Sequence, residues 1–307
     1  MSVIERKVVQ SADGTAIYAE ATGDKGKPVA VFIHGFAMTS SAFDGIFEDK
    51  AWTSWGHLIR YDVRGNGRSG KPTADAAWAS GRLAEDFDAV MAAFGVSDAR
   101  PFVVGWSLGG TYITDILASH PPSYLSGIVY AAALPYMGPT LSLVAAPAVL
   151  SLLPALTQTS DVDLYQAASR EFVGLCYAAF DLAAACASAT DSDADHRTAL
   201  GILGAALLQP RAVTVQLLSR TQDPGPLLAA GRAGALPLLV LNGTEDKVIQ
   251  RQAVVDAVDG WDARQLRVVD LEGAEHFLWL GTGKEAFGKT VRGWVGDVLA
   301  AAQRMYP

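Results

Sequence analysis

A serine between two glycines, directly after a short apolar run, is the feature that most constrains this chain. Residues 101–104 have the composition of a buried strand, and Gly105-Trp106-Ser107-Leu108-Gly109 follows at once. The two glycines leave no side chain where the backbone folds sharply, and Gly110 lets a following helix begin close to the strand. The pattern predicts a strand, a tight turn and a helix, with the Ser107 hydroxyl exposed at the turn.

Apolar runs of the same kind recur along the chain and alternate with segments that are compatible with helices. Continuous apolar composition is typical of strands buried on both faces of a parallel sheet, and alternation with helices indicates βαβ units. Helices are expected at 81–94, 111–119 and 284–303. We expect an N-terminal hairpin at 6–10 and 16–20, then strands at 28–33, 58–61, 101–104, 127–132, 237–241 and 266–269.

The alternation stops after Ala133, and the chain is then rich in Ala and Leu until the sheet pattern resumes near Pro237. We predict a mostly parallel α/β core at 1–135 and 226–307, with a helical lid inserted at 136–225. Residues 131–160 carry no charge, but a membrane span needs about 20 uninterrupted helical residues. Four prolines break this stretch, so we do not expect membrane insertion: Pro135, Pro139, Pro147 and Pro154.

Reactive groups in open α/β sheets collect at the carboxyl ends of the strands, and four informative sites follow predicted strands in this chain. They are Gly35-Phe36, Ser107, Asp246 and His276. The order Ser, Asp, His is the one expected for a hydrolase built around such a serine turn. Glu245 is a rival for the acid.

The chain resembles the α/β-hydrolase-fold superfamily over nearly its whole length, in the branch of serine hydrolases with a lid that includes esterases and cofactor-free haloperoxidases. Four stretches carry the resemblance: His34-Gly35-Phe36, residues 62–69 (Asp-Val-Arg-Gly-Asn-Gly-Arg-Ser), the serine turn, and Gly273-Ala274-Glu275-His276-Phe277. By this resemblance the charges of 62–69 are structural, and His34 shapes the neighbouring loop.

The resemblance implies a role for each site residue. Ser107 would be the nucleophile, His276 the general base and Asp246 the acid that orients the imidazole. The backbone N–H groups of Phe36 and Leu108 would stabilise the oxyanion. Asp246 matches the family position better than Glu245, because Lys247-Val248 follows it.

Large apolar residues flank these motifs and predict a pocket for an apolar or aromatic substrate, lined by Phe36, Met38, Trp106, Val248 and Phe277. The leading hypothesis is hydrolysis of a carboxylic ester or lactone through an acyl-enzyme on Ser107. Perhydrolase or haloperoxidase-like chemistry and carbon–carbon bond hydrolysis use the same three residues and stay open. So does a slow-turnover ligand receptor of this fold.

Composition limits the partners of the chain. A net charge of -8 and a pI near 5.1 disfavour nucleic acid and anionic membranes, which would repel an acidic protein. Cys176 and Cys186 do not have the spacing of a zinc site or of a redox motif, which is consistent with a reducing compartment. Charged residues at 5–7 stand where a signal peptide would need its apolar segment. We therefore expect a cytoplasmic protein. No metal-ligand cluster or nucleotide fingerprint is evident, so we expect no cofactor and no metal, in a monomer or homodimer.

Overall fold

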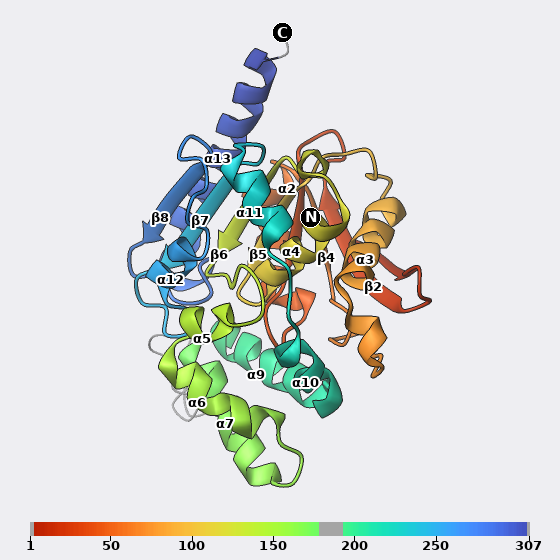
Figure 1. Ribbon diagram of the computed structural model, residues 1–307, viewed down its shortest axis with the longest axis vertical. Helices are drawn as coiled ribbons and strands as arrows, with labels where there is room; N and C mark the ends of the chain where they lie inside the picture. Colours follow the sequence, from red (N-terminus) through yellow and green to blue (C-terminus); the bar gives the residue numbers. More distant parts are fainter. Residues whose placement is uncertain (1–2, 178–192, 306–307) are drawn as a thin grey trace.

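An eight-stranded sheet forms the centre of the protein, as a computed structural model that describes residues 3–177 and 193–305 shows (Figure 1). The spatial order is β1-β2-β4-β3-β5-β6-β7-β8. Within this sheet the pairs β1–β2 and β2–β4 are antiparallel, and the other neighbouring strands are parallel. The strands are β1 (Glu5–Gln10), β2 (Ala16–Gly23), β3 (Val29–Ile33), β4 (His57–Tyr61), β5 (Phe102–Trp106), β6 (Gly127–Ala131), β7 (Leu238–Gly243) and β8 (Leu266–Leu271).

The predicted α/β class and mostly parallel sheet are confirmed, and each expected strand is present. Every residue of β3, β4, β5, β6 and β7 is buried, because helices cover both faces of the central strands. The strand before the serine turn extends to Trp106, two residues beyond the predicted end, so the chain leaves the sheet at Ser107 itself.

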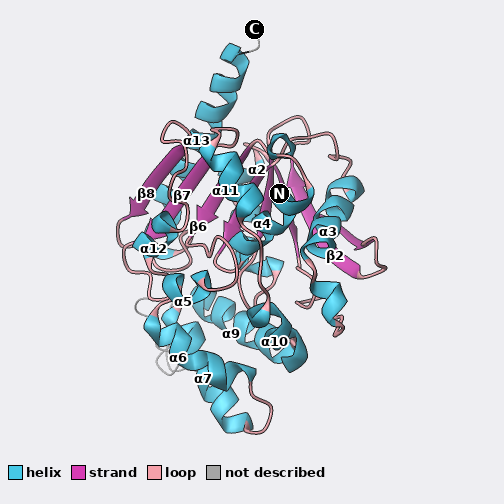
Figure 2. Cartoon of the chain, viewed as in Figure 1, coloured by secondary structure: helices cyan, strands magenta, loops and turns pink. Residues whose placement is uncertain are grey.

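Helices flank the sheet in two layers (Figure 2). On one face α3 (Ser80–Ala93), α4 (Gly109–Ser119) and α11 (Gly225–Arg232) pack side by side, while α13 (Lys284–Met305) contacts β6 and β7. Short helices complete the core: α1 (Asp44–Phe47), α2 (Lys50–Thr53), α12 (Arg251–Asp256), and the 3₁₀ turns η1 (Ser40–Phe43), η2 (Asp75–Trp78), η3 (Pro122–Tyr124) and η4 (Gly281–Gly283).

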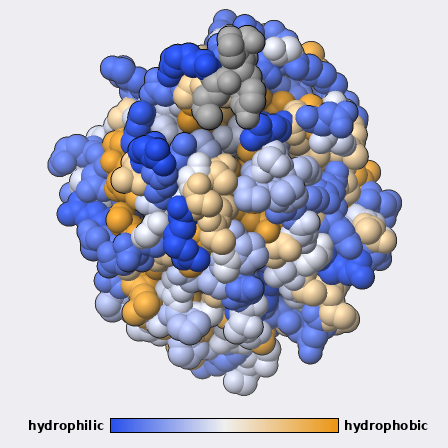
Figure 3. All heavy atoms as spheres, turned by 45° about the horizontal axis from the view of Figure 1, so that its top comes forward, coloured by the Kyte–Doolittle hydropathy of each residue, from blue (hydrophilic) through white to orange (hydrophobic). Residues whose placement is uncertain are grey.

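The last turns of α13 protrude from one end of the molecule (Figure 1). Residues 301–304 of this helix are exposed. With this end turned toward the viewer, the surface is mainly hydrophilic, and hydrophobic residues show only in scattered patches (Figure 3).

Five helices between residues 140 and 219, in the connection from β6 to β7, form a helical insertion at the opposite end of the molecule (Figure 1). Prolines set its helix boundaries, since Pro139 caps α5 and Pro147 begins α6. The division into core and lid at 136–225 stays a prediction. The helices of the insertion are α5 (Thr140–Val144), α6 (Pro147–Thr157), α7 (Val162–Leu175), α9 (Asp193–Leu208) and α10 (Arg211–Ser219).

Among the described helices, none is both long and apolar enough to cross a membrane by itself. Leu200–Leu208 and Arg211–Ser219 reach that length and composition only as a pair, and they meet at a bend of 93°. Of the two cysteines, Cys176 is buried and free, and Cys186 lies outside the described residues.

One glutamine fixes both ends of the helical insertion to helix α4. Gln222 accepts a hydrogen bond from the Met137 N–H (2.8 Å) and donates to the Thr111 carbonyl (2.9 Å) and to Asp115 (2.7 Å). Arg220 adds an ion pair of 2.6 Å to the fully buried Asp115. Because α4 begins just after Ser107, the insertion is anchored to the helix that carries the serine turn.

The buried ring of His57 makes the stability of the protein depend on pH. It is 1 % exposed at the start of β4, and within the described part of the protein neither ring nitrogen makes a hydrogen bond of normal geometry, although the Thr22 backbone lies close enough to favour the charged ring slightly. Burial, helped by the charge of Lys25, lowers the pKa of His57 below its usual 6.5. The unfolded chain therefore binds this proton more readily, and acidification through about pH 6.5 favours unfolding.

We expect His57→Leu to reduce the loss of thermal stability on acidification. The Tm of the wild type should fall more between about pH 7.5 and about pH 5 than that of the variant, because only the wild type takes up this proton on unfolding. Differential scanning calorimetry of both proteins measures the difference. Equal pH slopes would contradict this assignment.

Candidate functional site

The turn after β5 holds Ser107 in a conformation that side chains rarely adopt. The φ angle of Ser107 is +54°, in the left-handed region. Three backbone hydrogen bonds hold it there: its N–H donates to the Ala131 carbonyl (3.2 Å), and its own carbonyl accepts from the N–H groups of Gly110 (3.1 Å) and Leu134 (2.9 Å). The turn is therefore tied both to the helix that follows it and to the loop after β6.

Glycines allow the backbone segments around Ser107 to approach each other. A Cβ on Gly109 would lie 2.2 Å from the carbonyl oxygen of Ile33, and one on Gly105 would lie 2.7 Å from the Cα of Gly110. Neither obstacle is a flexible side chain. The predicted strand, turn and helix are thus present, with α4 beginning at Gly109. The prediction that the Ser107 hydroxyl is exposed is wrong, because side chains of the insertion cover the turn and leave Ser107 only 6 % exposed.

The loop after β3 lies directly against Ser107. A Cβ on Gly35 would be 2.9 Å from the Cβ of Ser107. His34 Nε2 accepts a hydrogen bond from the Val63 N–H (3.0 Å), and His34 Nδ1 donates to the Gly35 carbonyl (2.9 Å). Burial lowers the pKa of His34, which favours the neutral ring that this pair of bonds requires.

The hydrogen bond from His34 to the Gly35 carbonyl fixes the orientation of the peptide group between Gly35 and Phe36. The described chain contains no cis peptide bond, so the Phe36 N–H points away from the Gly35 carbonyl and therefore away from the His34 ring. The next residue, Ala37, has a φ angle of +54°. His34 thus has a structural contact of the kind that the sequence resemblance implies.

Asp246 and His276 form a buried pair. Asp246 Oδ2 lies 3.0 Å from His276 Nδ1, and the two side chains are 3 % and 1 % exposed. The other carboxylate oxygen accepts from the N–H groups of Val248 (2.7 Å) and Ile249 (3.1 Å). Both oxygens are occupied, so the carboxylate has one orientation toward the ring. Glu245, the rival acid, is exposed.

Trp106 links the serine turn to the His276 loop. Its indole N–H donates to the His276 carbonyl (2.9 Å), and its ring centroid lies 5.2 Å from that of the imidazole. The ring of Phe277 also packs against the indole, with 4.4 Å between the ring centroids. Trp106 is fully buried, so these contacts hold the loops of residues 107 and 276 together.

A small apolar cavity of about 40 Å³ opens over Ser107. Of the predicted pocket residues, Phe36 and Val248 line it, whereas Met38, Trp106 and Phe277 are buried in the core around it. The residues that the insertion contributes are not marked by any sequence motif. These are Leu141, Ala145, Val149, Leu153, Phe172 and Leu218.

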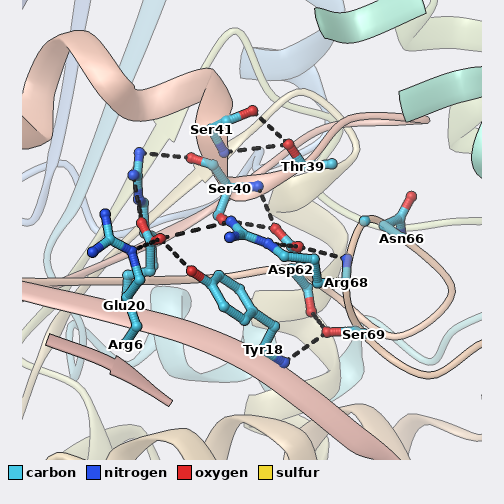
Figure 4. Close-up of polar contacts among 12 residues, drawn as sticks. Arg6, Tyr18, Glu20, Thr39, Ser40, Ser41, Asp62, Asn66, Arg68 and Ser69 are labelled. Carbon is cyan, nitrogen blue, oxygen red and sulfur yellow. Dashed lines mark hydrogen bonds and ion pairs between the residues drawn. The ribbon is translucent and has the colours of Figure 1, made fainter. Parts of the chain in front are cut away.

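A buried polar network supports the loop after β3 (Figure 4). The Asp62 carboxylate accepts hydrogen bonds from the N–H (2.8 Å) and hydroxyl (2.6 Å) of Ser40 and from the Arg68 N–H (2.8 Å). Beside it, burial opposes ionisation of Glu20, but hydrogen bonding from Tyr18 and the charge of Arg60 outweigh burial and lower its pKa. The carboxylates of Asp62 and Glu20 are therefore held by hydrogen bonds to neighbouring residues of the fold.

The described side chains include no group of three His, Cys, Asp or Glu residues that could hold a metal ion. Burial raises the pKa of the Cys176 thiol, and the nearby charge of Asp246 raises it further, so this cysteine has the environment of an unreactive thiol.

Comparison with known proteins places the chain in a family. The family model for the alpha/beta hydrolase fold matches residues 28–281. The chain belongs to the alpha/beta hydrolase family. Among curated proteins, a probable oxidoreductase named EphD from Mycobacterium tuberculosis is 35 % identical over 85 residues, which is 28 % of this chain. The match spans only 14 % of that relative's own length.

Solved structures share the fold over almost the whole chain. A putative aryl esterase from Burkholderia cenocepacia has a TM-score of 0.80 at 23 % identity, covering 96 % of this chain and 100 % of that one. The esterase RhEst1 from Rhodococcus sp. ECU1013 has a TM-score of 0.79 at 23 % identity, covering 95 % and 99 %. A bromoperoxidase from Bacillus anthracis has a TM-score of 0.67 at 17 % identity, covering 94 % and 98 %.

The strained φ angle predicts that Ser107→Gly is more stable than Ser107→Ala. Both variants lose the hydroxyl, but glycine also removes the left-handed penalty of about 1–2 kcal/mol, part of which is offset by its greater freedom in the unfolded chain. We expect a Tm about 2 °C higher for Ser107→Gly in calorimetry. A lower Tm for the glycine variant would contradict strain at this position.

Proposed function

We propose that the protein is a serine hydrolase that cleaves a carboxylic ester or lactone of a small, largely apolar molecule. The observation that carries the proposal is the buried Asp246–His276 pair, with 3.0 Å between Oδ2 and Nδ1. The indole of Trp106, the residue before the strained Ser107, contacts the loop of His276. A hydroxyl becomes a useful nucleophile when a base can take its proton and a third group orients that base.

The proposed reaction has two halves, acylation and deacylation of Ser107, and the same three residues act in both. Ser107 Oγ attacks the ester carbonyl while its proton passes to His276 Nε2, and Asp246 stabilises the imidazolium. The alcohol leaves with that proton, and an acyl-enzyme remains on Ser107. Water then gives a proton to His276 and attacks the acyl group, so the acid is released and Ser107 regains its proton.

Two backbone N–H groups would stabilise the oxyanion of each tetrahedral intermediate. Leu108 follows the nucleophile, and the Phe36 N–H is oriented by the bond between His34 and the Gly35 carbonyl. The absence of a Cβ on Gly35 supports this arrangement, because one would lie 3.3 Å from Ser107 Oγ. The apolar cavity beside Ser107 supports an apolar substrate.

Ser107→Ala tests the nucleophile. On a panel of aryl and alkyl esters and lactones, we expect a fall of about 10³-fold or more in kcat/KM, while Ser126→Ala, at a distant exposed hydroxyl, should keep wild-type activity. Intact-mass measurement should show one fluorophosphonate adduct on wild type and none on Ser107→Ala. A wild type that is neither labelled nor faster than Ser107→Ala on any ester would refute the proposal.

Asp246→Asn and Glu245→Gln test the choice of acid. We expect Asp246→Asn to lower kcat about 10²-fold or more, because the amide cannot stabilise the imidazolium, and Glu245→Gln to change it less than about threefold. Steady-state kinetics on the best ester gives both values. A larger loss in Glu245→Gln would assign the role to Glu245.

A further inference from the structure

A second cavity lies behind the one at Ser107, separated from it by two phenylalanine rings. The second cavity has a volume of about 10 Å³ and is enclosed by α6, α7, α9 and α10. Phe36 and Phe172 line both cavities. Their rings meet edge to face, with centroids 5.7 Å apart and an interplanar angle of 88°. The two rings therefore form a wall between the cavities.

The volumes of the two cavities indicate how long a substrate chain fits beside Ser107. About 10–15 Å³ of such space holds one water molecule, so the 40 Å³ cavity at Ser107 holds about three non-hydrogen atoms and the second holds about one. A short acyl or alkyl group fits beside Ser107. A longer chain meets the ring of Phe172, which is 6 % exposed and comes from α7 in the insertion.

The space behind the wall suits hydrocarbon. Leu156, Val173 and Ile202 line it together with polar residues, including the charged Arg211, and these polar groups are already paired. Gln209 donates to the Asn66 side chain (2.6 Å) and accepts from the Thr214 hydroxyl (3.1 Å). A methylene chain entering this space would leave no buried polar group without its partner.

We propose that Phe172 determines the chain length of the ester that the enzyme accepts, by closing the cavity at Ser107 against the apolar space among α6, α7, α9 and α10. This inference rests on the proposed ester hydrolysis. Phe36 forms the other half of the wall, but its backbone N–H belongs to the proposed oxyanion site. Phe172 is therefore the residue through which chain length can change without altering that site.

The test compares Phe172→Ala with wild type on p-nitrophenyl butyrate and octanoate. Each additional methylene that becomes buried contributes up to about fourfold in kcat/KM. We expect the octanoate-to-butyrate ratio of kcat/KM to rise about 10-fold or more in the variant. A milder truncation, Phe172→Val, should raise the ratio in the same direction and covers the case in which Phe172→Ala does not fold.

Val173→Ala is the matched control. Val173 is the next residue on α7, is 3 % exposed, and lines only the second cavity. Its truncation enlarges that space but leaves the wall intact, so the ratio should stay within about twofold of wild type. An equal rise of the ratio in Val173→Ala and Phe172→Ala would overturn the assignment to Phe172.

A binding measurement keeps the inference independent of turnover. In a Ser107→Ala background, calorimetric titration should show 1-octanol binding about 10-fold more tightly when Phe172→Ala is added, with a smaller change for 1-butanol. Unchanged octanol binding overturns the inference even if wild type hydrolyses esters. Failure of the proposed function is detected separately, as a wild type that is not labelled at Ser107.

Discussion

The close approach of backbone segments around Ser107 is the constraint on which the rest of the site depends. β3, β5 and the start of α4 come so near each other that a single methyl group on Gly105 or Gly109 would overlap main-chain atoms. This packing forces Ser107 to a φ angle of +54°. It also brings the loop of Gly35 against the serine, which is the arrangement that the proposed nucleophile and the proposed N–H donor of Phe36 require.

Polar contacts outside the proposed reaction centre preserve this arrangement. The His34 ring and the Asp62 carboxylate both join the loop after β3 to the turn after β4, through Val63 and Ser40. Gln222 and Asp115 perform a similar task for the insertion, which they fix to α4. The proposed catalytic residues and the walls of the cavity at Ser107 are thus anchored to the same few elements of the sheet and its first covering layer.

Much of the fold was predictable because its signals are local. Apolar runs mark the buried strands, and glycines mark the turn, since a Cβ at Gly105, Gly109 or Gly110 would overlap backbone atoms. Asp246 and His276 follow strands whose carboxyl ends meet at one edge of a parallel sheet, so linear order already indicated their proximity. The order of the strands in the sheet was not predictable from these runs, because apolar composition does not indicate which buried strands are neighbours.

The sequence by itself determined the class of fold, the serine turn and the identity of three candidate reactive side chains, since each depends on residue type and local order. Only the tertiary structure decided what surrounds them. Trp106 and Phe277 pack behind His276 rather than in the cavity, and Phe172 reaches Phe36 from a helix 136 positions further along the chain. The physical reason is that side-chain packing between distant segments depends on the relative placement of whole elements. No periodicity within one segment encodes that placement.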